Sequence, residues 1–177
     1  MKRKIQIGVI GSGADLKYSS EVEKSAFELG RLIAKSKNIT VFGAEKDYDS
    51  LSTAASRGAK QQGGLTVGVT YGVKKDIWDK DGNTDIIIVT GLERGGGREF
   101  VLVNSCDVII SVSGGSGTLT EIAIGYQLNI PIVALIGTGG WTDKLVGTFL
   151  DSRKRLKILS ARTPAEAVNM AIKVVNK

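Results

Sequence analysis

Residues 111–121 read SVSGGSGTLTE, and this stretch could hold an anion. It follows an apolar run, DVII at 107–110, and precedes a predicted helix. A helix N-terminus presents unpaired N–H groups and a partial positive charge, and glycines let the backbone approach a phosphate closely. The glycines and hydroxyl side chains of the loop are Ser113, Gly114, Gly115, Ser116, Gly117 and Thr118. On spacing alone, a structural turn with a capping box formed by Thr118 and Glu121 explains the stretch equally well.

Three further glycine-rich loops follow apolar runs, at residues 11–15, 42–47 and 137–143. The first contains Gly11, Ser12 and Gly13, which resemble the start of a dinucleotide fingerprint, but Leu16 occupies the third glycine position. The second contains Gly43. In the third, Trp141 follows Gly139 and Gly140, and it could line a ligand pocket, form a subunit contact or fill the core beside a tight turn. None of the four loops is a Walker A loop, because no Lys-Ser/Thr pair completes one.

The chain has no histidine and one cysteine, and this composition excludes several kinds of site. Zinc sites built on imidazole and Ser-His-Asp triads are ruled out, and we predict no metal site. Acid–base chemistry would fall to Asp, Glu, Lys or Tyr. Arg98 could pair with a phosphate or a carboxylate. The alternatives for Arg98 are surface exposure or an ion pair with Glu121, and Cys106 is expected to be a buried structural residue.

The net charge is +6, and a basic cluster, RKRLK, occupies residues 153–157. A solvated loop explains this cluster better than nucleic-acid binding does, because no aromatic residues interleave with it. The longest apolar runs are far too short to span a bilayer, and MKRK is followed by a glycine-rich loop rather than by a signal-peptide pattern. We therefore expect a cytoplasmic protein with no membrane partner.

The elements that position these loops alternate along the chain. Strand-like apolar runs occupy 5–10, 39–42, 65–69, 85–89, 107–112, 131–136 and 157–160. Helical patterns occupy 21–34, 49–62, 97–105, 118–128 and 142–150, and a last helix follows Thr163, Pro164 and Glu166, which suggest a capping box. Several strands are continuously apolar, as strands buried on both faces are.

The pattern predicts one domain over residues 1–177. It is an α/β, Rossmann-like, doubly wound fold with a mostly parallel sheet of about seven strands flanked by helices. Ligands of such sheets bind beyond the carboxyl ends of the strands, near the point where the strand order reverses.

The motifs resemble those of a known family. GGSGTLTE at 114–121 matches G-G-x-G-T-x-x-E, the motif of the "lysine decarboxylase-like" proteins, which include the LOG-type phosphoribohydrolases. IGVIG at 7–11, residues 57–69, residues 98–121 and GTGGWTDK at 137–144 resemble the branch that contains molybdenum-cofactor carrier proteins. The resemblance implies a Rossmann-like fold, a homodimer or homotetramer, and a nucleotide or phosphate pocket at the GGxGT loop. It does not imply lysine decarboxylase activity.

LOG-type enzymes cleave the N-glycosidic bond of nucleoside 5′-monophosphates with an Arg and a Glu, which correspond by position to Arg98 and Glu121. The chain departs from their pattern at three places. Glu99 stands at a Lys position, Ser113 stands at a Pro position, and residues 43–51 lose a glycine and gain acidic residues.

We therefore predict a protein that binds a nucleotide or a pterin-type phosphorylated cofactor. A phosphoribohydrolase using Arg98 and Glu121 is the alternative. The predicted binding residues are Gly11, Ser12, Gly13, Gly43, Ser113, Gly114, Gly115, Ser116, Gly117, Thr118, Gly139, Gly140 and Trp141.

Overall fold

One parallel sheet organises the computed structural model, which describes residues 3–176. Its seven strands lie in the order β4-β3-β2-β1-β5-β6-β7, and all neighbouring pairs are parallel. The strands are β1 (Gln6–Gly11), β2 (Ile39–Gly43), β3 (Leu65–Thr70), β4 (Ile86–Val89), β5 (Val108–Val112), β6 (Ile132–Leu135) and β7 (Leu159–Ala161). All five residues of β5 are buried, as the continuously apolar runs predict. The predicted Rossmann-like α/β fold is confirmed.

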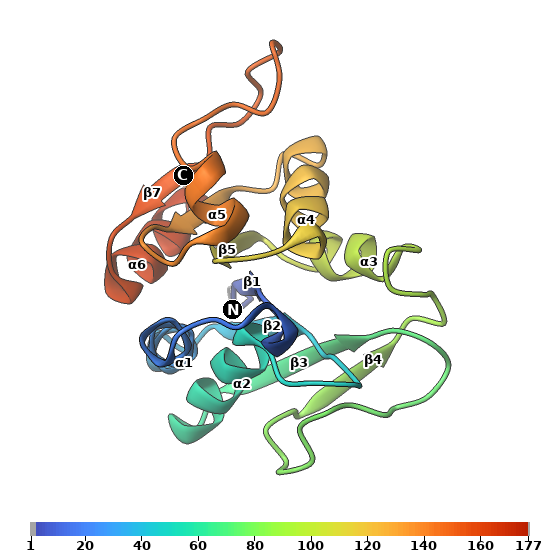
Figure 1. The fold of residues 1–177 in the computed structure, drawn as a ribbon. Coiled ribbons are helices and arrows are strands. Elements are labelled where there is room, and N and C mark those ends of the chain that lie inside the picture. The colour runs from blue at the N-terminus through green and yellow to red at the C-terminus, as the bar shows by residue number, and fades with distance from the viewer. Residues whose placement is uncertain (1–2, 177) are drawn as a thin grey trace.

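Helices cover both faces of the sheet (Figure 1). One face is covered by α1 (Ser20–Lys35), α2 (Leu51–Gln61) and α6 (Pro164–Val175), and the other by α3 (Arg98–Asn104), α4 (Ser116–Gln127) and α5 (Gly140–Leu145). A short 3-10 helix, η1 (Ala14–Leu16), follows β1. Each face has its own buried apolar cluster, so the sheet is the shared wall of two cores.

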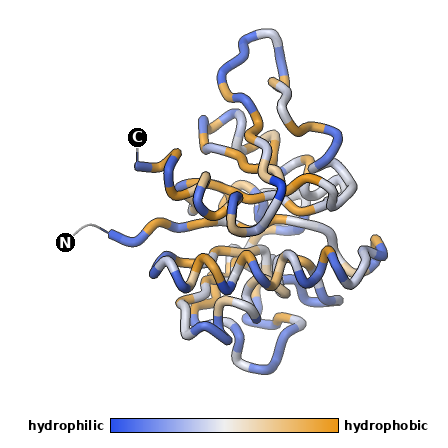
Figure 2. The backbone as a smooth tube through the Cα atoms, turned by 90° about the vertical axis from the view of Figure 1, so that its left-hand side faces the viewer, coloured by the Kyte–Doolittle hydropathy of each residue, from blue (hydrophilic) through white to orange (hydrophobic). Residues whose placement is uncertain are grey.

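The carboxyl ends of the strands and the two ends of the described chain lie at opposite edges of the sheet. All strands are parallel, so the chain leaves every strand at one edge and each helix returns it to the other edge. The described chain enters β1 and leaves α6 at the amino edge, and Figure 2 shows both ends on the same side. The carboxyl edge is therefore free to carry a site.

Two glycines bring α1 and α2 into backbone contact. A Cβ on Gly30 would lie 1.7 Å from the carbonyl oxygen of Ala55, and one on Gly58 would lie 1.9 Å from the carbonyl oxygen of Phe27. Neither position has room for a side chain without separating the helices. This contact fixes α2, whose N-terminus follows the loop after β2.

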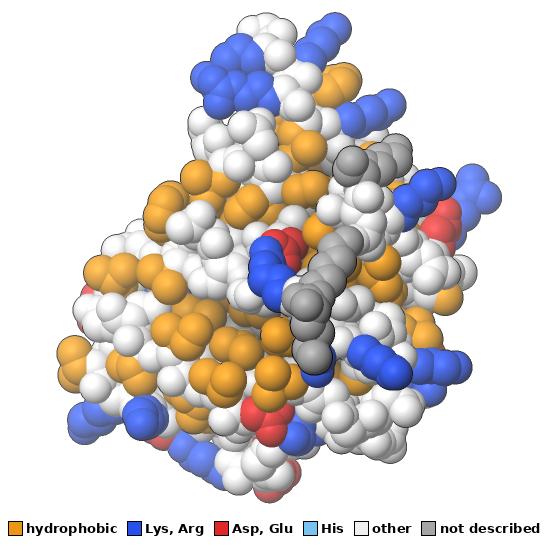
Figure 3. Space-filling model, turned by 180° about the vertical axis from the view of Figure 1, so that it is seen from behind, with side chains coloured by type: hydrophobic (Ala, Val, Ile, Leu, Met, Phe, Trp, Pro, Cys, Tyr) orange, Lys and Arg blue, Asp and Glu red, His pale blue; other side chains and the backbone are white. Residues whose placement is uncertain are grey.

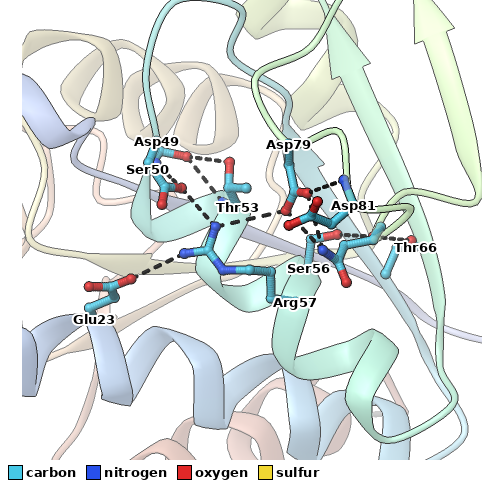
Figure 4. Close-up of polar contacts among 10 residues, drawn as sticks. Glu23, Asp49, Ser50, Thr53, Ser56, Arg57, Thr66, Asp79 and Asp81 are labelled. Carbon is cyan, nitrogen blue, oxygen red and sulfur yellow. Dashed lines mark hydrogen bonds and ion pairs between the residues drawn. The ribbon is translucent and has the colours of Figure 1, made fainter.

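A polar cluster around Arg57 attaches the 74–85 segment to α2 (Figure 4). Its guanidinium lies 3.1 Å from Glu23, 3.0 Å from Asp49 and 3.8 Å from Asp79. The Ser56 hydroxyl, also on α2, donates to the carbonyl oxygen of Asn83 at 2.5 Å. Side chains of α2 thus attach the longest polar stretch of the sequence, and Thr66 of β3 bonds it as well, at Asn83 and Asp85.

Two expectations about helix ends need correction. Thr163 caps α6 as predicted, accepting from the Glu166 N–H at 3.1 Å, but Glu166 accepts from the Arg162 N–H instead of closing the box on Thr163. The helix expected over 142–150 is shorter and starts earlier, at Gly140–Leu145. Its start is set by Gly139 and Gly140 at positive φ, a conformation that glycine adopts without strain.

The basic cluster at 153–157 lies on an exposed segment between α5 and β7 that projects from the body (Figure 1). Figure 3 shows Lys and Arg side chains gathered on this projection. The Asp151 carboxylate pairs with Arg153 and accepts from the buried Tyr126 hydroxyl at 2.7 Å. None of the described helices is long and apolar enough to cross a bilayer, and the cytoplasmic location stays a prediction.

Candidate functional site

The candidate site lies where the strand order reverses. β1 and β5 are neighbours, and the chain proceeds from β1 toward β2 on one side and from β5 toward β6 on the other. The loops that leave β1 and β5 therefore diverge and flank a crevice at the carboxyl edge. A cavity of about 210 Å³ opens there. A larger depression of about 720 Å³ lies on α6, but its walls are mostly apolar.

Nine of the predicted site residues line the cavity, and six do not. Those that line it are Gly11, Ser12, Gly13, Arg98, Gly115, Ser116, Gly117, Thr118 and Glu121. Those outside its wall are Gly43, Ser113, Gly114, Gly139, Gly140 and Trp141. Asp15, Leu16, Glu45, Tyr48, Arg94 and Glu99 complete the wall without having been predicted as site residues.

The Ser113–Thr118 loop is joined to the loop after β1 by one hydroxyl. The Gly114 N–H donates to Ser12 Oγ at 2.8 Å, and Ser12 Oγ donates to Ser113 Oγ at 3.1 Å. Ser12 is only 3% exposed, so this pair of bonds is shielded from water. The backbone of Gly13 packs against the Tyr48 ring: a Cβ on Gly13 would lie 2.5 Å from that ring.

The N-terminus of α4 faces the cavity without a side-chain cap. Gly115 is the N-cap residue and offers no side-chain acceptor to the first turn. The next three residues, Ser116, Gly117 and Thr118, line the cavity. The first N–H groups of a helix have no intrahelical partner, so this end presents free donors and the positive end of the helix dipole.

The alternative interpretation of this stretch, a capping box formed by Thr118 and Glu121, is wrong. Ser113 and Gly114 have positive φ, 56° and 106°, and turn the chain so that α4 begins at Ser116. Thr118 is therefore inside the first turn and Glu121 lies one turn deeper, where it is 6% exposed. Glu121 is a buried group of the cavity wall.

The GTGGW loop supports the Ser113–Thr118 loop from behind. The Trp141 N–H donates to the Gly114 carbonyl and the Thr142 N–H to the Ser113 carbonyl, each at 3.0 Å. A Cβ on Gly140 would lie 2.5 Å from the Gly114 oxygen. The structure places Gly139, Gly140 and Trp141 behind the loop, and Thr142 is a buried residue that supports it. The half-buried Trp141 ring has Lys144 Nζ 4.6 Å from its centre, so it does not fill the core.

Arg98 is a buried cation of the cavity wall, so the surface alternative is wrong. It is 4% exposed, and its Nη2 lies 3.0 Å from Glu45 Oε1 and 3.4 Å from Glu99 Oε1. Within residues 3–176 it makes no direct ion pair with Glu121, and its Nε has no hydrogen-bond partner. Gly43 makes room for this guanidinium, because a Cβ there would lie 2.2 Å from Arg98 Nη1.

Arg94 is the second cation of the wall, and sequence reasoning missed it. Its Nη2 pairs with Glu45 Oε2, and its guanidinium lies 5.0 Å from the Tyr48 ring centre and 5.2 Å from that of Tyr71. Such cation–π contacts hold an arginine in place. The one signal in the sequence was a second arginine in ERGGGREF, four residues before Arg98.

Glu121 holds its proton near neutral pH. Burial raises its pKa to about 8; Arg98 opposes this rise, while Glu99 and Glu45 add to it. Desolvation is the largest effect on this pKa. The cavity wall carries four carboxyl groups, on Asp15, Glu45, Glu99 and Glu121, against two guanidinium groups.

Cys106 is a structural residue, as predicted. It is 7% exposed, its Sγ donates to the Leu102 carbonyl at 3.2 Å, and burial raises the pKa of its thiol. Over residues 3–176 there is no group of His, Cys, Asp and Glu side chains placed to hold a metal ion.

Comparisons with known proteins agree with this geometry. The model of the SLOG cluster4 family matches residues 4–168. An uncharacterized protein of Archaeoglobus fulgidus is 38% identical over 123 residues, which are 70% of this chain and 74% of that protein. The solved molybdenum cofactor carrier protein of Chlamydomonas reinhardtii is 32% identical, with a TM-score of 0.81 over 99% of this chain and 100% of that one. The solved molybdenum cofactor binding protein of Rippkaea orientalis is 28% identical, with a TM-score of 0.80 over 100% of both chains.

The raised pKa of Glu121 predicts a pH-dependent cost to folding. Below about pH 4.5 the carboxyl is protonated in both states. Between there and about pH 8 the unfolded chain releases the proton that the folded chain keeps, so stability falls as pH rises. Glu121→Gln cannot ionise. Its free energy of unfolding, compared with that of the wild type, should therefore rise by about 2–4 kcal/mol as the pH rises through this range.

Urea unfolding at pH 5, 6.5 and 8 measures this difference. Glu93→Gln, at an exposed position outside the cavity, is the matched control and should show no such trend. A gap between Glu121→Gln and the wild type that stays constant with pH would contradict the assignment.

Proposed function

The chain belongs to the SLOG cluster4 family, and on that premise we propose that it binds a nucleotide or a pterin-type phosphorylated cofactor. The relatives from Chlamydomonas reinhardtii and Rippkaea orientalis, which are named as a carrier and a binding protein of the molybdenum cofactor, support the pterin-type ligand. In this proposal the protein holds its ligand without changing it chemically.

The observation that carries the proposal is the uncapped N-terminus of α4 at the cavity. Gly115 offers no side-chain acceptor, and Ser116, Gly117 and Thr118 line the wall. A phosphate there would accept from the free N–H groups of the first turn and lie at the positive end of the helix dipole. Gly114 is not available to it, because the Gly114 N–H already donates to Ser12.

The size of the cavity fits part of such a ligand. About 210 Å³ is less than the roughly 300–1,000 Å³ of cavities that enclose drug-sized molecules. We therefore assign the phosphate end of the ligand to the cavity and the ring system to its open rim. Tyr48 and Leu16 offer apolar surface at this rim.

Replacing Gly115 separates binding from folding. Gly115→Asp puts a carboxylate at the N-cap, a position where aspartate stabilises helices, but its charge would occupy the proposed phosphate site. In thermal unfolding, AMP, GMP or phosphorylated pterins should raise the melting temperature of the wild type and leave that of Gly115→Asp unchanged. Without ligand, Gly115→Asp should have the melting temperature of the wild type.

Gly115→Ala adds the same Cβ without a charge and is the matched control. The added Cβ meets only the end of the Leu16 side chain, at 2.6 Å. If no phosphorylated ligand raises the melting temperature of the wild type, the proposal is wrong.

A second function, nucleoside 5′-monophosphate phosphoribohydrolase, is favoured by the protonated Glu121. A carboxyl group that keeps its proton near neutral pH can donate it to a departing base, and Arg98 could orient the ribose phosphate. Against this function, Glu45 already occupies Arg98, and Glu99 stands where LOG-type enzymes have a lysine.

Incubation with a panel of nucleoside monophosphates followed by chromatography tests this second function. If the protein is this enzyme, the nucleotides release free base and ribose 5-phosphate. The rate of release by Glu121→Ala should then be at least about 100-fold lower than that of the wild type, the typical contribution of a general acid. Release that survives in Glu121→Ala would mean that another group acts.

We also propose that the protein forms a homodimer or homotetramer through α3 and α4. Phe100 on α3 is 48% exposed and lines a shallow depression of about 420 Å³ together with Leu119, Ala123 and Ile124 of α4. An apolar patch of this kind on two adjacent helices supports an interface between copies.

Phe100→Glu places a charge in this patch and should convert the oligomer to a monomer. Light scattering measures the mass, and Phe149→Glu, at a 39% exposed phenylalanine outside this depression, is the matched control. A wild type with the mass of one chain would refute the proposal.

A further inference from the structure

Both cations of the cavity wall are bound to one carboxylate. Glu45 Oε1 lies 3.0 Å from Arg98 Nη2, and Glu45 Oε2 pairs with Arg94 Nη2. The Glu45 side chain is 13% exposed and lies in the cavity wall. The Glu45 carboxylate bridges the two guanidinium groups through one Nη2 of each, and a ligand phosphate would compete for these charged donors.

The backbone holds Glu45 in this position. The Glu45 carbonyl accepts from the Trp78 N–H at 2.7 Å, and the preceding Ala44 donates to the Val69 carbonyl at 3.0 Å. These bonds extend the end of β2 alongside β3, so Glu45 approaches the guanidinium groups from a fixed strand end. Its side chain can leave them by rotation while its backbone stays in place.

Arg98 does not depend on Glu45 alone. Glu99 Oε1 lies 3.4 Å from the same Nη2, and Glu99 is 3% exposed. A buried arginine needs a counter-charge, and Glu99 would supply it if Glu45 moved away. Arg98 Nε is buried without a hydrogen-bond partner in the described chain, so Glu45 and Glu99 do not satisfy every donor of this guanidinium.

We propose that a phosphate at the N-terminus of α4 also pairs with Arg94 and Arg98 in the same cavity wall, and that it must displace Glu45, their internal counter-ion, to do so. Glu45 thereby keeps inorganic phosphate out of the pocket. The inference rests on the proposed binding function. Displacing Glu45 from the two arginines costs free energy, and inorganic phosphate can offset this cost only through its own charge. A larger ligand adds contacts of its sugar or ring system at the rim and can offset the same cost.

Isothermal titration of inorganic phosphate into Glu45→Gln tests this role. The amide has the shape of the carboxylate and no charge, so phosphate should bind Glu45→Gln at least about tenfold more tightly than it binds the wild type. Glu93→Gln removes the same charge outside the cavity and should bind like the wild type. GMP is titrated into every variant in parallel.

The outcomes separate this inference from the function on which it rests. If GMP binds and phosphate binds Glu45→Gln no more tightly than the wild type, Glu45 is not a competitor and the binding function stands. If neither GMP nor any phosphorylated pterin binds any variant, both proposals fail.

If Glu45→Gln does not fold, Glu45→Asp replaces it, with folding checked by circular dichroism. Its shorter carboxylate cannot span both guanidinium groups, so phosphate should again bind more tightly than in the wild type. Unchanged or weaker binding overturns the inference.

Discussion

The Gly114 N–H donates to the Ser12 hydroxyl, and the candidate site depends on this bond. Gly114 and Ser12 follow adjacent parallel strands, β5 and β1, whose helices then diverge along the sheet. The bond ties the two loops together at that divergence, and the Trp141 N–H holds Gly114 from behind. With the N–H and the carbonyl of Gly114 both bonded, α4 begins at Ser116, and the first residues of α4 line the cavity.

The charged side chains of the cavity wall change the electrostatic potential at the N-terminus of α4. The dipole of a helix is equivalent to about half an elementary charge, while the wall carries four carboxyl groups and two guanidinium groups. Burial keeps Glu121 protonated, and Glu45 is bound by two arginines. The affinity for an anion therefore depends on which acids are charged and where they point, and less on the number of arginines.

The strands and the position of the site could be predicted from the sequence, because buried parallel strands are continuous apolar runs and their carboxyl ends share an edge. The starts of α4 and α5 could not. They are set by positive φ at Ser113 and Gly139, and by bonds between loops that are distant in the sequence. Glu45 and Arg94 were missed as site residues for a similar reason, because they are 49 positions apart and only the fold brings them together.

The two edges of the sheet separate the chain ends from the cavity. The described chain begins and ends at the amino edge, and the cavity opens at the carboxyl edge. A tether at either end would therefore leave the pocket facing the solution. A protein fixed to a sensor surface or a resin through either end of the described chain would have its cavity at the opposite edge of the sheet.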